Sequence, residues 1–195
     1  MDHYYIDNKD LKHEIKVLKY QLGEKEFLIK SDRGVFSANQ IDKGTDIFIG
    51  TLLSLPLKGK ILDLGAGSGV IGIVLKTINP EIEIDFSDIN ERAINLVKLN
   101  LEAHKLKGNI YLSDSFEKIK ENYDYILLNS PISVGKEKCY QMYREAKEHL
   151  KTNGQLIIVI RKDKGALSHQ KYLLSLFRDV KIINKEKGYY VIRSY

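Results

Sequence analysis

The pattern of apolar and polar residues predicts alternating strands and helices over most of the chain. Short apolar runs rich in β-branched residues are typical of strands, and apolar residues three or four positions apart are typical of helices. Strands are expected over residues 60–63, 82–87, 109–112, 123–128 and 155–160. Helices are expected over residues 45–53, 70–78, 90–101, 142–150 and 167–177, with Thr45 and Asn90 as caps.

Both ends of the chain have the pattern of hairpins. Residues 14–20 and 26–30 resemble two strands connected through Gly23. Two further strands, over residues 180–183 and 189–192, are separated by a connection so short that they must pair antiparallel. We therefore expect an α/β fold: a Rossmann-like, doubly wound, mostly parallel sheet that ends in an antiparallel hairpin, preceded by a small N-terminal β-hairpin.

Length and composition fit one domain. The 195 residues are 43% hydrophobic and 29% charged, and we expect a single domain over residues 1–195, with residues 1–35 as a hairpin extension and residues 36–195 as the Rossmann-like core. No apolar run approaches the roughly 20 residues that cross a bilayer, and the first residues lack a signal-peptide pattern. We expect a cytoplasmic protein without membrane contact, as a monomer or weak homodimer.

Net charge and the numbers of cysteines and histidines exclude few functions. The net charge of +5 suits a polyanionic partner without requiring one. The single cysteine, Cys139, excludes an internal disulfide. The five histidines show no ligand spacing and are interpreted as surface residues, so no metal site is expected.

A glycine-rich segment, Asp63-Leu64-Gly65-Ala66-Gly67-Ser68-Gly69, joins the expected strand at 60–63 to the helix at 70–78. Glycines at such a turn let the backbone approach a ligand closely, and the helix N-terminus offers free N–H groups. Residues 67–72 also satisfy G-x-G-x-x-G, the dinucleotide fingerprint. The glycines alone therefore fit a nicotinamide cofactor or S-adenosylmethionine, or they serve only strand-helix packing.

Acidic residues help to distinguish a nicotinamide cofactor from S-adenosylmethionine. Asp63 directly precedes the loop, where a carboxylate suits a cofactor with a cationic amino-acid moiety and is unhelpful beside a pyrophosphate. Asp88 ends the second strand and is placed to accept hydrogen bonds from ribose hydroxyls, although it could also cap the helix after Asn90. Asp114 and Ser115 follow the third strand and could bind an adenine amino group or form a turn. Asp63 therefore favours S-adenosylmethionine.

The segment Asn129-Ser130-Pro131-Ile132 follows the fourth strand. An aromatic amine is a poor nucleophile because its lone pair is delocalised into the ring. The side-chain carbonyl of Asn129 and the backbone carbonyl of Ser130 can each accept an N–H hydrogen bond and so aim the lone pair at a methyl donor. The spacing alone predicts a planar amine as the substrate.

Together these segments resemble the class I S-adenosylmethionine-dependent methyltransferases that modify an exocyclic amine, whose motif here is Asn/Asp-Pro-Pro. More narrowly, the chain resembles the methyltransferase small domain group, which includes ribosomal RNA small-subunit guanine-N2 methyltransferases. Similar residues lie at 34–37, 41–45, 88–90, 135–136, 164–166 and 187–191, so the resemblance covers essentially the whole chain.

The resemblance implies methyl transfer to the N2 amine of a guanine in small-subunit (16S) ribosomal RNA, with ribosomal RNA or the small ribosomal subunit as partner. The catalytic residues would be Asn129, Ser130 and Pro131. Cofactor contacts are expected from Asp63, Gly65, Gly67, Gly69, Asp88, Ile89, Asp114, Ser115 and Asn129. Substrate contacts are expected from Phe36, Ile132, Lys136 and Lys164.

One position departs from the group's pattern, because Ser130 stands where the group has proline. The backbone carbonyl is kept, but the rigidity of proline is lost. If nothing else is lost, a Ser130→Pro variant should be at least as active. The alternatives are methylation of a protein glutamine amide, a module that binds S-adenosylmethionine or RNA without turnover, and, more distantly, a nicotinamide oxidoreductase.

Overall fold

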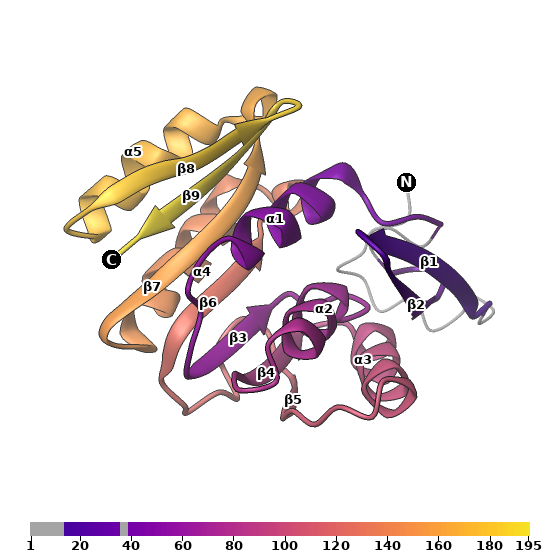
Figure 1. The fold of residues 1–195 in the computed structure, drawn as a ribbon. Coiled ribbons are helices and arrows are strands. Elements are labelled where there is room, and N and C mark those ends of the chain that lie inside the picture. Colours follow the sequence, from indigo (N-terminus) through magenta and orange to yellow (C-terminus); the bar gives the residue numbers. More distant parts are fainter. Residues whose placement is uncertain (1–13, 36–38) are drawn as a thin grey trace.

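The computed structural model describes residues 14–35 and 39–195. A seven-stranded sheet with the order β5-β4-β3-β6-β7-β9-β8 forms its centre (Figure 1). Its parallel part consists of β3 (Lys60–Leu64), β4 (Glu83–Asp88), β5 (Ile110–Leu112), β6 (Tyr123–Asn129) and β7 (Leu150–Arg161). The last two strands, β8 (Val180–Glu186) and β9 (Tyr189–Ser194), pair antiparallel. The expected doubly wound sheet with a terminal antiparallel hairpin is confirmed.

Helices cover both faces of the sheet (Figure 1). One layer contains α1 (Lys43–Leu53), α2 (Val70–Ile78) and α3 (Glu91–Ala103), and the other contains α4 (Lys136–Glu148) and α5 (Ala166–Leu176). Each face of the sheet has its own hydrophobic core. Neighbouring residues of β3 point to opposite faces, so Ile61 packs with the first layer and Leu62 with the second. Both side chains are fully buried, as expected for a central strand covered on both faces.

The N-terminal hairpin pairs β1 (Lys16–Leu22) with β2 (Lys25–Ser31), as the sequence predicts. A fully buried α3 residue, Asn100, joins this hairpin to the glycine-rich loop. Its Oδ1 accepts a hydrogen bond from the backbone N–H of Lys30 at 2.7 Å. Its Nδ2 donates to the carbonyls of Lys30 and Ser68, both at 2.9 Å. The hairpin is thus fixed directly beside the loop that follows β3.

Three local expectations are wrong. The cap of α1 is Asp42, not Thr45, because the Asp42 carboxylate accepts from the backbone N–H groups of Gly44 and Thr45. Leu150 belongs to β7 and pairs with Tyr123 instead of extending α4. His169 is only 2% exposed and is therefore not a surface residue. The cap of α3 is Asn90, as expected.

No helix among residues 14–35 and 39–195 is both long and apolar enough to cross a membrane.

Candidate functional site

The order of the strands reverses between β3 and β6, which lie side by side and parallel. The last paired residues are Leu64 and Leu128, so the segments beginning at Gly65 and Asn129 leave the same edge of the sheet next to each other. Ligands of doubly wound proteins bind in the crevice at such a switch point. The topology therefore brings the two motifs singled out from the sequence to one place.

The glycines after β3 divide into two kinds. Gly65, Gly67 and Gly69 have φ angles of +69°, +58° and +80°, a region that other residues rarely adopt. Gly72 has a packing role, because a Cβ atom there would lie 2.3 Å from the buried ring of Phe86. The last glycine of the dinucleotide fingerprint is therefore explained by the contact between α2 and β4.

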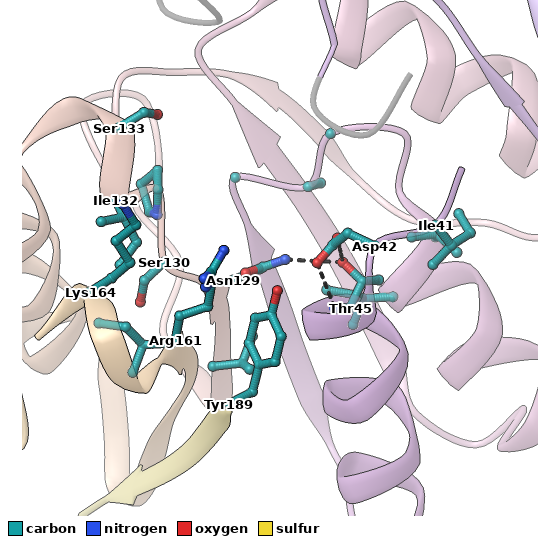
Figure 2. A pocket seen from close by; sticks show the side chains of 18 of the residues that line it. Ile41, Asp42, Thr45, Asn129, Ser130, Ile132, Ser133, Arg161, Lys164 and Tyr189 are labelled. Carbon is teal, nitrogen blue, oxygen red and sulfur yellow. Dashed lines mark hydrogen bonds between the residues drawn. The ribbon is translucent and has the colours of Figure 1, made fainter. Parts of the chain in front are cut away.

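A cavity of about 330 Å³ opens between the glycine-rich loop and the end of β6, a size typical of small-molecule sites. Figure 2 shows several side chains that converge on it. Of the residues predicted from the sequence, it is lined by Gly65, Gly67, Asn129, Ser130, Pro131, Ile132 and Lys164. Its wall also includes Ile41, Asp42, Thr45, Arg161 and Tyr189, which the sequence interpretation did not assign to the site.

A second, smaller cavity of about 30 Å³ shares Gly65 with the first and lies at the ends of β4 and β5. Its wall includes the predicted residues Asp88, Ile89, Asp114 and Ser115. The Asp88 carboxylate accepts from the backbone N–H groups of Gly67 and Asn90, each at 2.9 Å, and so ties the glycine-rich loop to β4. Asp114 forms a 2.7 Å ion pair with Lys138, which also lines this cavity.

Two hydroxyl groups in the second cavity's wall lack hydrogen-bond partners among the described residues. Within the described part of the chain, the side-chain oxygens of Ser87 and Ser115 are buried and have no hydrogen-bond partner. Ser115 also has a φ of +51°, an unfavourable conformation for a residue other than glycine. Buried polar groups without partners cost free energy. The residues here therefore fit single polar groups of a nucleoside, such as a ribose hydroxyl, which would satisfy them.

Asp63 lies outside both cavity walls. It is 1% exposed, and its Oδ2 accepts a 3.1 Å hydrogen bond from the backbone N–H of Gly72. Burial raises its pKa to about 7, against the lowering effect of the Gly72 hydrogen bond, and the nearby Asp88 charge adds to the increase. In this structure Asp63 holds the start of α2 against β3, and its contact with a ligand stays a prediction.

Two other predicted residues also lie apart from the cavities. Gly69 and Lys136 belong to neither of the two walls. Gly69 caps α2, and the Lys136 ammonium lies 5.8 Å from the centre of the Tyr140 ring. Phe36 is outside the described residues.

The Asn129 side chain is held in one orientation at the wall of the larger cavity. Its Nδ2 donates to the hydroxyl of Thr45 at 3.0 Å, which leaves the carbonyl on the opposite side of the amide group (Figure 2). The next carbonyl, that of Ser130, accepts from the backbone N–H of Ile132 at 2.9 Å. This contact spans an inverse γ-turn at Pro131, with φ of −78° and ψ of 74°. Because a carbonyl has two lone pairs, Ser130 can still accept a second bond.

Ser130 is anchored through both its backbone and its hydroxyl. Its N–H donates to the carbonyl of Val159 at 3.2 Å, and its hydroxyl lies 3.1 Å from that of Tyr143. The Tyr143 hydroxyl in turn lies 2.8 Å from Nδ1 of His169. Burial, together with the charge of Lys136, lowers the pKa of His169 to about 4, so the ring is neutral near pH 7.

The cavity residues that the sequence interpretation missed come from segments far along the chain. Tyr189 begins β9 and meets the start of α1, where a Cβ on Gly44 would lie 2.7 Å from its ring. Arg161 ends β7 and pairs with Asp163. The resemblance over residues 187–191 includes Tyr189 but assigned it no role in the site, and no segment of the resemblance includes Arg161.

Comparison with known proteins identifies the family. A model of the methyltransferase small domain matches residues 26–193. The uncharacterized protein YbxB of Bacillus subtilis is 36% identical over 196 residues, which cover 99% of this chain and 98% of that protein.

Two proteins named ribosomal RNA small subunit methyltransferase C are also similar. The protein of Aliivibrio fischeri is 41% identical over 135 residues, or 67% of this chain and 39% of the relative. The protein of Haemophilus influenzae is 33% identical over 188 residues, or 93% of this chain and 56% of the relative. The chain thus spans about half the length of these relatives, or less.

A solved structure shows the same fold. The T. thermophilus 16S rRNA N2 methyltransferase (RsmC), in complex with AdoMet and guanosine, superposes with a TM-score of 0.82 at 22% identity. The match covers 92% of this chain and 50% of that chain. With the family model matched over most of the chain, the resemblance inferred from the sequence motifs is confirmed. The chain belongs to the methyltransferase small domain family of S-adenosylmethionine-dependent methyltransferases.

Proposed function

We propose that this protein transfers a methyl group from S-adenosylmethionine to the exocyclic N2 amine of a guanine in small-subunit (16S) ribosomal RNA. The observation that carries the proposal is the orientation of Asn129, whose amide nitrogen is bound by Thr45 at the wall of the larger cavity. Its carbonyl is thereby available to a group that donates an N–H. An exocyclic amine on a planar base is such a donor.

The two adjoining cavities would bind different parts of the cofactor. The smaller cavity, with Asp88, Ser87 and Ser115, would contact hydroxyl groups of the cofactor's ribose. Because Gly65 lines both cavities, the remainder of the cofactor would extend toward the larger cavity, where Asn129 lies. The cofactor supplies an activated methyl group on a sulfonium centre. The protein therefore needs to position the amine and has no need of a nucleophile of its own.

Asn129 and Ser130 would position the amine. An N–H bond to each carbonyl turns the nitrogen lone pair out of conjugation with the ring and favours the pyramidal nitrogen that forms as the methyl group is received. The nitrogen becomes more positive during this step, so both carbonyl contacts strengthen in the transition state. The methylated amine, now carrying the positive charge, then passes one proton to solvent water and becomes neutral.

Several features support RNA as the substrate. Arg161 and Lys164 lie in the wall of the larger cavity, where cationic groups can meet phosphates. The net charge of the chain is +5. The relatives named above as ribosomal RNA small subunit methyltransferase C carry this substrate in their names. A guanine in RNA would have to leave its stack to enter the cavity.

The test uses S-adenosylmethionine labelled in the methyl group. Unmodified 16S RNA and assembled small subunits lacking the modification are each offered to the protein, and the nucleosides are then separated by mass. Labelled N2-methylguanosine is the expected product. The Asn129→Ala variant should still bind the cofactor in calorimetry but lose most of the transfer. Label in protein but not in RNA, or full transfer by Asn129→Ala, would overturn the proposal.

A further inference from the structure

The amide group of Asn129 can face a substrate in two ways, and the difference decides what it binds. With its oxygen toward the cavity it accepts a hydrogen bond, whereas with its nitrogen toward the cavity it donates one. The two orientations have nearly the same shape, so the surrounding hydrogen bonds select between them. An amine that must donate its N–H requires the first orientation.

The hydrogen bonds around Thr45 select that orientation. The Asp42 carboxylate caps α1 by accepting from the backbone N–H groups of Gly44 and Thr45 at 2.8 and 3.2 Å. Its second oxygen contacts the Thr45 hydroxyl. An ionised carboxylate can only accept, so the single hydrogen of the Thr45 hydroxyl points to Asp42. The Thr45 oxygen then offers only lone pairs to its other neighbour, Asn129.

Asn129 must therefore present its NH₂ group to Thr45, in agreement with the 3.0 Å bond from Nδ2 to Oγ1 (Figure 2). Thr45 is only 5% exposed, so water has little room to replace a lost partner. We propose that Asp42, acting through Thr45, is a positioning residue that fixes the Asn129 carbonyl as the group facing the substrate amine. The inference rests on the proposed function and names residues that the motif itself does not contain.

This arrangement also explains why residue 129 is an amide in this chain. A carboxylate at 129 would place its lone pairs against those of the Thr45 oxygen, because the only hydroxyl hydrogen already points to Asp42. Two carboxylates would then compete for one hydrogen. An aspartate at 129 becomes compatible only if the group at 42 can donate.

Exchanging the two side-chain types tests the inference directly. Asp42→Asn keeps a good helix cap, but its NH₂ would donate to Thr45 and turn the Thr45 hydrogen toward Asn129. The amide of Asn129 must then rotate, since a buried hydroxyl hydrogen without a partner is costly. Asp42→Asn and Asn129→Asp should each lower kcat on the order of 100-fold, a much larger effect than on KM for RNA.

The double variant Asp42→Asn with Asn129→Asp should recover much of that loss, because the new amide at position 42 donates to Thr45 and Thr45 donates to the new carboxylate at position 129. Thr45→Val, which removes the acceptor and leaves the carboxylate cap in place, should lose activity as the single variants do, and Thr45→Ser should keep it. A double variant no more active than either single variant, or a fully active Thr45→Val, would overturn the inference.

A spectroscopic measurement separates this inference from the proposed substrate. In the wild-type protein, nuclear Overhauser effects should connect the Asn129 side-chain amide protons to the Thr45 methyl group, and they should disappear in Asp42→Asn. If RNA is never methylated but these effects behave as described, the substrate proposal fails and the positioning role stands. If the effects are absent from the wild-type protein, the positioning role fails whatever the activity.

Discussion

The hydroxyl of Ser130 lies 3.1 Å from the hydroxyl of Tyr143, inside the core between α4 and the sheet. Both residues are buried, and Tyr143 continues the contact to Nδ1 of His169 on α5. Burial raises the pKa of Tyr143 above its usual value, so this group stays a neutral hydrogen-bonding partner. Serine in the place of the family's proline therefore does more than lose rigidity, because it adds an anchor to α4.

Ser130→Pro should consequently destabilise the protein, an effect that the loss of rigidity alone did not predict. Proline removes the N–H that donates to Val159 at 3.2 Å, and it leaves Tyr143 without its Ser130 contact. Losing these two hydrogen bonds should lower the free energy of unfolding by about 1–3 kcal/mol. Urea unfolding at pH 7.5 or so, away from the titration of His169, measures the change.

Ser130→Ala serves as the control, because it removes only the hydroxyl contact and keeps the backbone bond to Val159. It should fall between the wild-type protein and Ser130→Pro in stability. A proline variant as stable as the wild-type protein would show that neither contact contributes, and the proline of the family would then be freely interchangeable with serine here.

Local patterns were enough to predict the fold. The strands and helices follow from apolar spacing within short windows, and the bounds of α2 agree with the expectation at both ends, residues 70 and 78. Gly65 lies beside Asn129 because β3 and β6 are parallel neighbours that end at a common edge of the sheet, and this neighbourhood is known from the structure.

Side-chain partners distant in sequence could not be predicted in the same way. Thr45 and Asn129 are 84 residues apart, and no local pattern connects them. Asp42 and Thr45 are both good cap residues only three positions apart, so the sequence alone could not separate the cap from the residue that meets Asn129. His169 looks polar in sequence, but it is buried with its Nδ1 2.8 Å from the Tyr143 hydroxyl, a partner from another helix.

The glycine-rich loop offers a second prediction, because Gly65 and Gly72 should respond differently to alanine. A Cβ at Gly72 would lie 2.3 Å from the fully buried Phe86 ring, which should cost about 1–3 kcal/mol of stability as overpacking. The nearest atom to a Cβ at Gly65 is 3.9 Å away, so the cost there comes mainly from its φ of +69°. Gly65 also borders both cavities.

Gly72→Ala should therefore lower the unfolding midpoint but leave the Kd of the folded protein for S-adenosylmethionine nearly unchanged. Gly65→Ala should raise that Kd at least as clearly as it lowers stability. Urea unfolding and calorimetry on both variants give the comparison. If Gly72→Ala proved to weaken cofactor binding without loss of stability, the packing role assigned to Gly72 would be wrong.

The buried carboxyl of Asp63 predicts a specific dependence of stability on pH. Its pKa rises from 3.8 to about 7 in the folded protein, chiefly through burial. Between about pH 4 and pH 7 the unfolded chain has lost this proton while the folded protein keeps it, so raising the pH favours the unfolded state. Asp63 therefore contributes a fall in unfolding free energy across this window, and no further change above it.

His169 contributes the opposite slope over nearly the same range, because its lowered pKa makes the folded protein resist protonation.

Comparison with Asp63→Asn isolates the carboxyl from His169. The asparagine oxygen can still accept from Gly72, but the side chain cannot ionise, so the difference in unfolding free energy between wild-type protein and variant should decline from pH 4 to pH 7 and then level off. Urea unfolding of the ligand-free proteins at pH 4.5, 6 and 8 or thereabouts would measure it. A difference that is independent of pH would mean that Asp63 is ionised throughout. The carboxylate would then already be charged without a ligand, and a cationic group bound near it would produce no proton release in calorimetry.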